Sequence, residues 1–300
     1  MRYCIFLSFI MLIVACESDV EINVKEGRSV TNMYAFIYPD SAVDVQLSKS
    51  VKIFSPVTFD YVKNATILLT VNSEQSQKVL IPNDTNYVRL PAPSLTYGDR
   101  IRLVATVNNA DSVVAETFVP TFVPISGIDT TTVMIRQDGK ISELLSFALS
   151  FADDRSTDDY YQVVVERQVL DGNRKVLTSE MVDFNKDDNV FNVAGQSIIG
   201  SQLVDLEGVF DDMLFNGHNY NVNFSMGREV VLPAVGEQGV RLRIRLYHHT
   251  YDYYNYFCIL KVYDYSDFFQ AIGQASLYSN VTNGVGLVSG MSFDEYFIYF

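Results

Sequence analysis

Val240-Arg241-Leu242-Arg243-Ile244-Arg245-Leu246 is the stretch that decides the fold class of this chain. Aliphatic side chains alternate with arginines at every position, which is the period of a β-strand with one buried and one exposed face. A helix would scatter the arginines around its circumference. The stretch therefore predicts a strand that carries three cations on one face. We expect acids on a neighbouring strand to pair with them, and an anion-binding site is the alternative.

The same alternation recurs along most of the chain, in segments rich in Val, Ile, Tyr, Phe and Thr. In Val43-Asp44-Val45-Gln46-Leu47 the three apolar side chains fall on one face. Asn, Asp, Gly and Pro separate these segments, as expected of turns between strands. The sequence therefore predicts an all-β protein. The other predicted strands lie at residues 65–71, 101–107, 144–151, 160–170 and 220–226.

Proline and glycine interrupt this pattern at Pro120, Pro124 and Gly127. Because such residues mark connections between elements, we place a domain boundary here. Residues 27–122 have the length and strand spacing of an immunoglobulin-like β-sandwich. Residues 128–300 are predicted to form a second, larger β-sandwich with longer connections.

One segment of the second domain departs from the strand pattern. Its tyrosines favour a strand by propensity, but Thr250 is a suitable N-cap and Asp252 follows in the first turn. Apolar positions beyond them follow helical spacing. We therefore predict a short helical insertion near residues 250–265, packed across a sheet.

The C-terminus combines spaced glycines with aromatic residues. Gly284, Gly286 and Gly290 lie among aliphatic residues, a pattern that lets a strand approach another backbone closely. The last eight residues are too apolar for a free tail. We expect their aromatic side chains to be buried in a final strand of the second sandwich or against a partner. These side chains are Phe293, Tyr296, Phe297, Tyr299 and Phe300.

The N-terminus has the features of a bacterial export signal. Arg2 supplies a positive charge, and residues 4–15 form an apolar run that is too short to span a bilayer. A small residue then precedes Cys16, whose thiol can take a diacylglyceryl group. We predict a signal peptide over residues 1–15 and a lipidated tether over residues 16–26. The alternatives are an ordinary secretory signal with a chance cysteine and an uncleaved anchor helix.

Cleavage before Cys16 also decides the cysteine and charge balance of the mature chain. Cys4 leaves with the signal and Cys16 carries lipid, so Cys258 is alone and no intrachain disulfide can form. The formal charge of −14 becomes −15, because the signal contains one arginine and no acid. Such a surface repels phosphate backbones, so we exclude nucleic acids as partners.

Several segments spread over nearly the whole mature chain share an order and spacing with a known family. They resemble the Bacteroidota outer-membrane lipoprotein family described as domain of unknown function 4249 (DUF4249). Asn283 departs from the family's pattern, which usually has a glycine there. The similar segments are Val45-Gln46-Leu47-Ser48, Asn64-Ala65-Thr66-Ile67, residues 97–103, residues 120–125, Tyr160-Tyr161, residues 210–217 and residues 279–287.

The resemblance implies a location and a partner, and it carries over no catalytic residue. Members of that family are outer-membrane lipoproteins often encoded beside TonB-dependent transporters. Glu17-Ser18-Asp19 resembles the short acidic export signals of surface lipoproteins, which implies exposure at the cell surface. We therefore expect a lipid-anchored protein at the outer membrane.

Candidate catalytic residues are few. His248 and His249 are adjacent, so on a strand they point to opposite faces and cannot share one ligand. His218 lies in a predicted loop, where a solvated histidine is the simpler interpretation. Residues 195–199 begin like a nucleophile elbow but lack its second glycine. We predict no catalytic residue and no cofactor.

Two other patterns could indicate ligands. The acidic segments 153–159 and 187–189 offer oxygen atoms to calcium, but neither has the spacing or glycine of a calcium-binding loop. We interpret both as solvated loops and predict no metal. Seven tyrosines between Tyr247 and Tyr265 could form a carbohydrate platform, but helical spacing would bury several of them. Core and interface packing is our interpretation.

Two functional hypotheses follow from the sequence. The first is a non-enzymatic accessory lipoprotein that partners a TonB-dependent transporter in nutrient capture or uptake, with a small-molecule or peptide cargo. The second is a surface carbohydrate-binding module or hydrolase that acts alone. Co-purification of a transporter would favour the first, and glycan binding or turnover by the lipid-free domain would favour the second.

Overall fold

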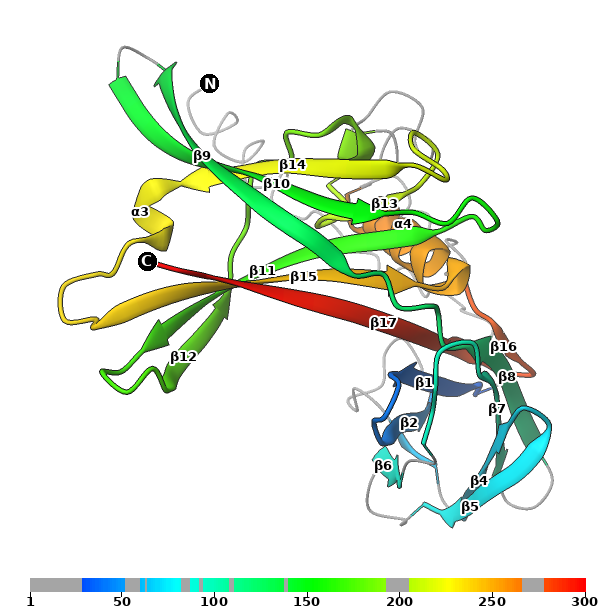
Figure 1. The fold of residues 1–300 in the computed structure, drawn as a ribbon. Coiled ribbons are helices and arrows are strands. Elements are labelled where there is room, and N and C mark those ends of the chain that lie inside the picture. Colours follow the sequence, from blue (N-terminus) through cyan, green and yellow to red (C-terminus); the bar gives the residue numbers. More distant parts are fainter. Residues whose placement is uncertain are drawn as a thin grey trace, which may run out of the picture.

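The computed structural model describes residues 29–51, 60–62, 64–81, 87–91, 94–107, 111–137, 140–192, 205–265 and 278–300. The predicted signal peptide, Cys16, the tether and residues 195–199 lie outside the described residues. Nearly all regular structure is β, which confirms the all-β prediction (Figure 1). In the described part of the chain, no helix is long and apolar enough to cross a bilayer.

Strands follow one another along the chain, with short turns between most of them. The strands are β1 (Thr31–Ile37), β2 (Val43–Lys49), β3 (Asp60–Tyr61), β4 (Ala65–Val71), β5 (Glu74–Leu80), β6 (Tyr87–Leu90), β7 (Arg100–Val107), β8 (Asp111–Phe118), β9 (Ile125–Gln137), β10 (Lys140–Ala152), β11 (Tyr160–Leu170), β12 (Val176–Met181), β13 (Val209–Asp211), β14 (Asn219–Gly227), β15 (Gly239–His249), β16 (Val281–Thr282) and β17 (Val285–Tyr299). The helices that lie wholly within the described residues include α3 (Arg228–Val231) and α4 (Tyr251–Tyr265), and residues 189–192 are also helical.

The first sandwich is immunoglobulin-like, as predicted. One layer contains β1, β2, β3 and β6, and the other has the strand order β16-β8-β7-β4-β5. In β7 the side chains of Ile101, Leu103 and Ala105 are buried while those of Arg100 and Arg102 are exposed. The two layers enclose one core of aliphatic side chains. The apolar residues that alternate with polar ones in the sequence are thus buried on one side of each strand.

The second sandwich packs β11, β12, β13, β15 and part of β17 against a three-stranded sheet of order β14-β10-β9. Its core contains aromatic rings from both layers, such as Phe147, Tyr161 and Phe224. Leu242 and Ile244 of β15 point into this core, and the arginines between them lie on the opposite face. The predicted strand at residues 240–246 is confirmed, with the expected orientation.

One strand, β17, belongs to both sandwiches (Figure 1). Its first half pairs in parallel with β1, from Asn32 opposite Val285 to Ile37 opposite Gly290. Its second half pairs antiparallel with β15, from Met291 opposite His249 onward. The sheet therefore continues from one sandwich into the other. This differs from the predicted boundary, which left residues 128–300 wholly in the second sandwich.

The spaced glycines allow this strand to lie against other backbones. Gly286 has a φ of +130°, and a Cβ there would be 2.0 Å from the carbonyl oxygen of Met33. A Cβ on Gly290 would be 1.8 Å from the carbonyl oxygen of Phe118. No side chain fits at such distances. The expected close approach of backbones is confirmed, and the neighbours are β1 and the end of β8.

The helical insertion and the C-terminal strand form where they were predicted, with two differences. Thr250 occupies the predicted N-cap position, where its carbonyl oxygen accepts from the N–H groups of Tyr253 and Tyr254, but its hydroxyl forms a hydrogen bond with the Ser289 hydroxyl at 2.8 Å. The C-terminal aromatic side chains are less buried than expected, since Tyr296 and Tyr299 are 38% and 54% exposed. The guanidinium of Arg241 lies 4.5 Å from the ring centre of Phe297, so this ring packs under a cation on the outer face.

We expect Gly290→Ala to destabilise the whole protein. The added methyl group would overlap the Phe118 carbonyl, and overpacking of this kind costs roughly 1–3 kcal/mol. The free energy of unfolding, measured by urea denaturation, should fall by about that amount. Gly127→Ala is the matched control, because nothing lies within 4 Å of a Cβ at Gly127. Equal stability of the two variants would contradict the proposed contact.

Candidate functional site

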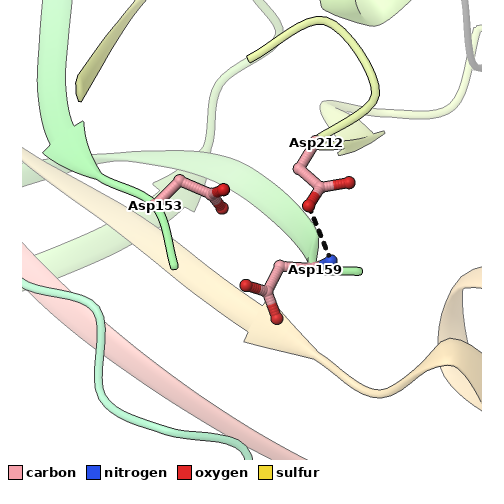
Figure 2. A group of neighbouring side chains, drawn as sticks. All are labelled: Asp153, Asp159 and Asp212. Atoms are coloured by element: carbon pink, nitrogen blue, oxygen red, sulfur yellow. Dashed lines mark hydrogen bonds between the residues drawn. The ribbon is translucent and has the colours of Figure 1, made fainter. Parts of the chain in front are cut away.

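The fold brings Asp153 and Asp159 together with Asp212, which lies 53 positions after Asp159 (Figure 2). Asp153 follows β10, Asp159 precedes β11, and Asp212 follows β13. One carboxylate oxygen from each lies within 4.8 Å of the others. Asp159 and Asp212 are each only 5% exposed. The interpretation of residues 153–159 as a solvated loop is therefore wrong at Asp159, although residues 154–158 are exposed.

Hydrogen-bond donors of the protein already occupy most of these carboxylate oxygens. Asp153 accepts from the Tyr161 hydroxyl and from the backbone N–H of Gly217, both at 2.6 Å. Asp212 accepts from the backbone N–H of Asp159 at 3.1 Å. Calcium needs six to eight oxygen ligands, so these three carboxylates supply too few free positions. The geometry favours a structural cluster that joins β10, β11 and β13.

His248 extends this cluster to the connection between the sandwiches. Its Nδ1 lies 2.9 Å from the carbonyl oxygen of Thr121, and its Nε2 lies 3.0 Å from Asp159 Oδ1. A carbonyl oxygen only accepts, so Nδ1 must be the donor. Nε2 and Asp159 must then share one further proton, on the imidazole or on the carboxyl group. Neither sequence position indicated this pairing.

The electrostatics of the cluster follow from burial. Burial raises the pKa of Asp212 to about 6, and the neighbouring carboxylates of Asp153 and Asp159 add to this effect. The N–H of Asp159 opposes it by donating a hydrogen bond. Burial likewise raises the pKa of Asp153, although Tyr161 and Gly217 act against the shift by donating to its carboxylate. Protonation of Asp212 is therefore easier here than in water.

The other acidic segment is also a structural element at one position. Asp188 is buried and accepts hydrogen bonds from the Tyr220 hydroxyl at 2.7 Å and from the backbone N–H of Asn223 at 3.1 Å. Asp187 is exposed, as expected for a solvated loop.

In the turn at His218, the ring Nδ1 lies 2.9 Å from the carbonyl oxygen of Asn216. This contact suits a loop histidine.

The arginines of β15 have the acidic partner that was expected. Glu166 of β11 accepts a hydrogen bond from Arg243 and another from Arg245, the latter at 3.3 Å. Arg241 donates to the side-chain carbonyl of Gln168 at 2.7 Å. Burial alone would raise the pKa of Glu166, but hydrogen bonds from Ser179 and Arg243 outweigh it and hold the pKa low. Pairing with a neighbouring strand is confirmed over a free anion site.

A pocket opens on this outer face, at the junction of the two sandwiches. We call it the inter-sandwich pocket, and its volume is about 390 Å³. Strands of both sandwiches and α4 line it. The pocket forms at this position because β17 joins the two sandwiches. Its polar and aromatic lining includes Tyr38, Gln162, Arg245, Tyr247, His249 and Tyr253.

Aromatic stacking fixes the rings around the inter-sandwich pocket. His249 lies between two tyrosines, with ring centres 3.8 Å from Tyr253 and 5.6 Å from Tyr247. Both pairs are nearly parallel. Tyr38 packs edge-on against Phe293 at 6.0 Å. The predicted core and interface packing of the tyrosines near α4 is thus confirmed for these rings, which also leave a pocket beside them.

Similarity to one family extends over nearly the whole chain. The model of the family described as Domain of unknown function (DUF4249) matches residues 17–296. The chain belongs to this family. No curated protein matches it. Among solved structures, it is similar to a two fibronectin type-III domain segment from chicken tenascin, with 10% identity, a TM-score of 0.23, and coverage of 73% of this chain and 90% of that chain.

In this DUF4249 member, we expect Asp212→Asn to be more stable than the wild type at pH 7. We expect no such gain at pH 3.5. The folded protein keeps the Asp212 proton up to a pH of about 6, whereas the unfolded chain releases it near its ordinary pKa. Stability linked to this proton is therefore present at low pH and lost as the pH rises through 6. Asparagine cannot ionise, so the variant should escape a loss on the order of 1–3 kcal/mol. Urea denaturation at several pH values measures it.

Asp187→Asn is the matched control, because Asp187 is exposed. Its stability should follow that of the wild type at every pH. Identical pH profiles for the wild type and Asp212→Asn would refute the linkage. A rise in wild-type stability with about 1–10 mM CaCl2, lost in Asp212→Asn, would show instead that the cluster holds a cation.

Proposed function

We propose that this protein is a non-enzymatic outer-membrane lipoprotein, anchored through Cys16 and exposed at the cell surface. In this proposal it acts as an accessory partner of a TonB-dependent transporter and helps to capture cargo for uptake. Membership of the DUF4249 family supports the proposal, because the family resemblance implies this location and this partner. The cargo is a small molecule or a peptide.

The observation that carries the proposal is the path of the chain away from the anchor. Thr31 begins β1, which runs parallel to β17 toward the second sandwich. The fourteen residues between Cys16 and Thr31 reach at most roughly 50 Å. The first sandwich would therefore stay near the bilayer, and the second would project from it. Such an arrangement would keep the protein within reach of a membrane-embedded partner and supports the proposal.

The chemistry of the described residues also supports a binding role. The described histidines have structural contacts: His248 bonds to Asp159 and Thr121, and His249 bonds to Gln162. Burial raises the pKa of the Cys258 thiol to about 12, so it is a poor nucleophile. A preformed pocket with fixed rings suits ligand capture.

A second function, a carbohydrate-binding module or hydrolase that acts alone at the surface, also has an observation in its favour. The inter-sandwich pocket presents aromatic rings beside polar groups. That combination serves sugar binding whether or not a transporter is present. The two proposals differ in whether a membrane partner is needed.

Replacement of the lipidated residue tests the anchor. We expect Cys16→Ala to be exported but released from the membrane fraction, because a soluble β body lacks the two anchoring signals that stable attachment requires. Flotation of outer-membrane vesicles after a high-salt wash measures this, with Cys258→Ala as the control that keeps the lipid. A Cys16→Ala protein that still floats would contradict lipid anchoring. Protease added to intact wild-type cells would test surface exposure.

Affinity purification from native membranes tests the partner. We expect the tagged wild-type protein, extracted in mild detergent, to bring down a large TonB-dependent transporter. Tagged Cys16→Ala, recovered from the soluble fraction, should bring down much less, because it no longer shares the membrane. Recovery of the wild-type protein alone, with glycan binding retained by the lipid-free form, would favour the module that acts alone.

A further inference from the structure

A residue that lines the inter-sandwich pocket has unmet hydrogen-bonding capacity. In the described part of the chain, three buried side-chain polar atoms have no hydrogen-bond partner. One of them, Nδ1 of His249, belongs to a residue that lines the inter-sandwich pocket. Buried polar groups are rarely left unpaired, because each costs roughly 1–3 kcal/mol. The unpaired Nδ1 of His249 therefore points to a ligand that can donate a hydrogen bond.

The protonation state of His249 can be assigned from its neighbours. The Gln162 amide nitrogen donates to the carbonyl oxygen of Glu207 at 3.2 Å, so its Oε1 is an acceptor. His249 Nε2, 3.1 Å from that Oε1, must therefore carry a hydrogen. Burial, with a contribution from His248, lowers the pKa of His249 to about 3, so the ring is neutral. Its Nδ1 is then an acceptor that lacks a donor.

The charged groups of the pocket neutralise one another. The Arg245 guanidinium donates to Glu166 and to Glu295, each at 3.3 Å, and to the Tyr247 hydroxyl at 3.0 Å. A charged ligand would have to compete with these pairs. An anionic ligand would in addition approach a chain with a net charge of −14. A neutral ligand meets neither obstacle.

The aromatic groups add a requirement for an apolar surface on the ligand. Rings of Tyr38, Tyr247 and Tyr253 line the pocket, and flat rings pack best against flat apolar faces. A purely apolar ligand would satisfy them but would leave Nδ1 of His249 without a hydrogen-bond donor. The ligand must therefore combine an apolar face with hydroxyl groups around its edge.

We infer that the inter-sandwich pocket binds a neutral saccharide, with the C–H face of a pyranose ring against the tyrosines and its hydroxyls directed to Gln162, Arg245 and His249. A hydroxyl group can donate a hydrogen bond, so it can serve the unpaired Nδ1 of His249. The volume of about 390 Å³ falls in the range of small-molecule sites. The inference names the cargo class of the proposed uptake function and rests on that proposal for its biological role.

Isothermal titration of the lipid-free Cys16→Ala protein tests the inference. The probes are glucose, galactose, maltose and lactose, with glucuronic acid, glucosamine and the tripeptide Gly-Tyr-Gly as comparisons. We expect at least one neutral sugar to bind with a Kd in the micromolar to millimolar range, more tightly than any comparison compound. Adding Tyr38→Ala should weaken binding by about tenfold or more, since one stacked ring and its hydroxyl are lost.

Tyr97→Ala is the matched control, because Tyr97 is an exposed tyrosine of the first sandwich that packs on Phe122 outside the pocket. It should leave sugar affinity unchanged. Absence of binding by all four neutral sugars at about 10 mM, or tighter binding of the tripeptide or a charged sugar, would overturn the inference. Equal loss of affinity in Tyr38→Ala and Tyr97→Ala would overturn the location.

The result of the sugar-binding test can be distinguished from the result of the test for a transporter partner. Purification of the lipidated protein with its transporter does not depend on the pocket, so lipidated Tyr38→Ala should still bring the transporter down. Co-purification without sugar binding would overturn the ligand class and leave the partnership standing. Sugar binding without co-purification would support the site and refute the partnership.

Discussion

The backbone hydrogen bonds of β17 are the constraint on which the rest of the structure depends. This strand uses one edge to pair with β1 and, farther along, its other edge to pair with β15. Two sandwiches that would otherwise be joined only by a short connection therefore share one sheet. The carbonyl oxygen of Thr121 in that connection accepts from Ser292 of β17 at 2.8 Å and faces His248 of β15. The relative position of the sandwiches is held by strand pairing and by these side chains together.

The functional features lie at this junction because the shared sheet creates it. The aspartate cluster fixes the ends of β10, β11 and β13 on one side of β15. On the other side of β15, the inter-sandwich pocket draws residues from β1 and from the second sandwich. Neither sandwich alone supplies all of its walls. Binding at the pocket would therefore report on the integrity of both halves.

Much of this architecture could be predicted from the sequence, because the pattern that marks a strand lies within a few consecutive residues. Strands with one buried face repeat every two residues, so the segments at residues 101–107 and 240–246 were recognised directly. The helix α4 was recognised from its spacing against its propensity. What could not be read was which distant elements meet. The glycines of β17 indicated a close approach without naming Met33 or Phe118, and nothing near Asp212 indicated that burial would bring it beside Asp153 and Asp159.

The shared strand also sets the order in which the chain can mature. Asn32 pairs with Val285, more than 250 positions later, so β1 lacks one of its two neighbouring strands until the last residues have been synthesised. Contacts so distant along the chain slow folding and favour late completion. In the proposed export of this chain as a lipoprotein, the delay would keep the first sandwich incomplete until the C-terminal end has crossed the membrane. The strand order thus determines when the first sandwich can be completed, as well as how the two sandwiches are joined.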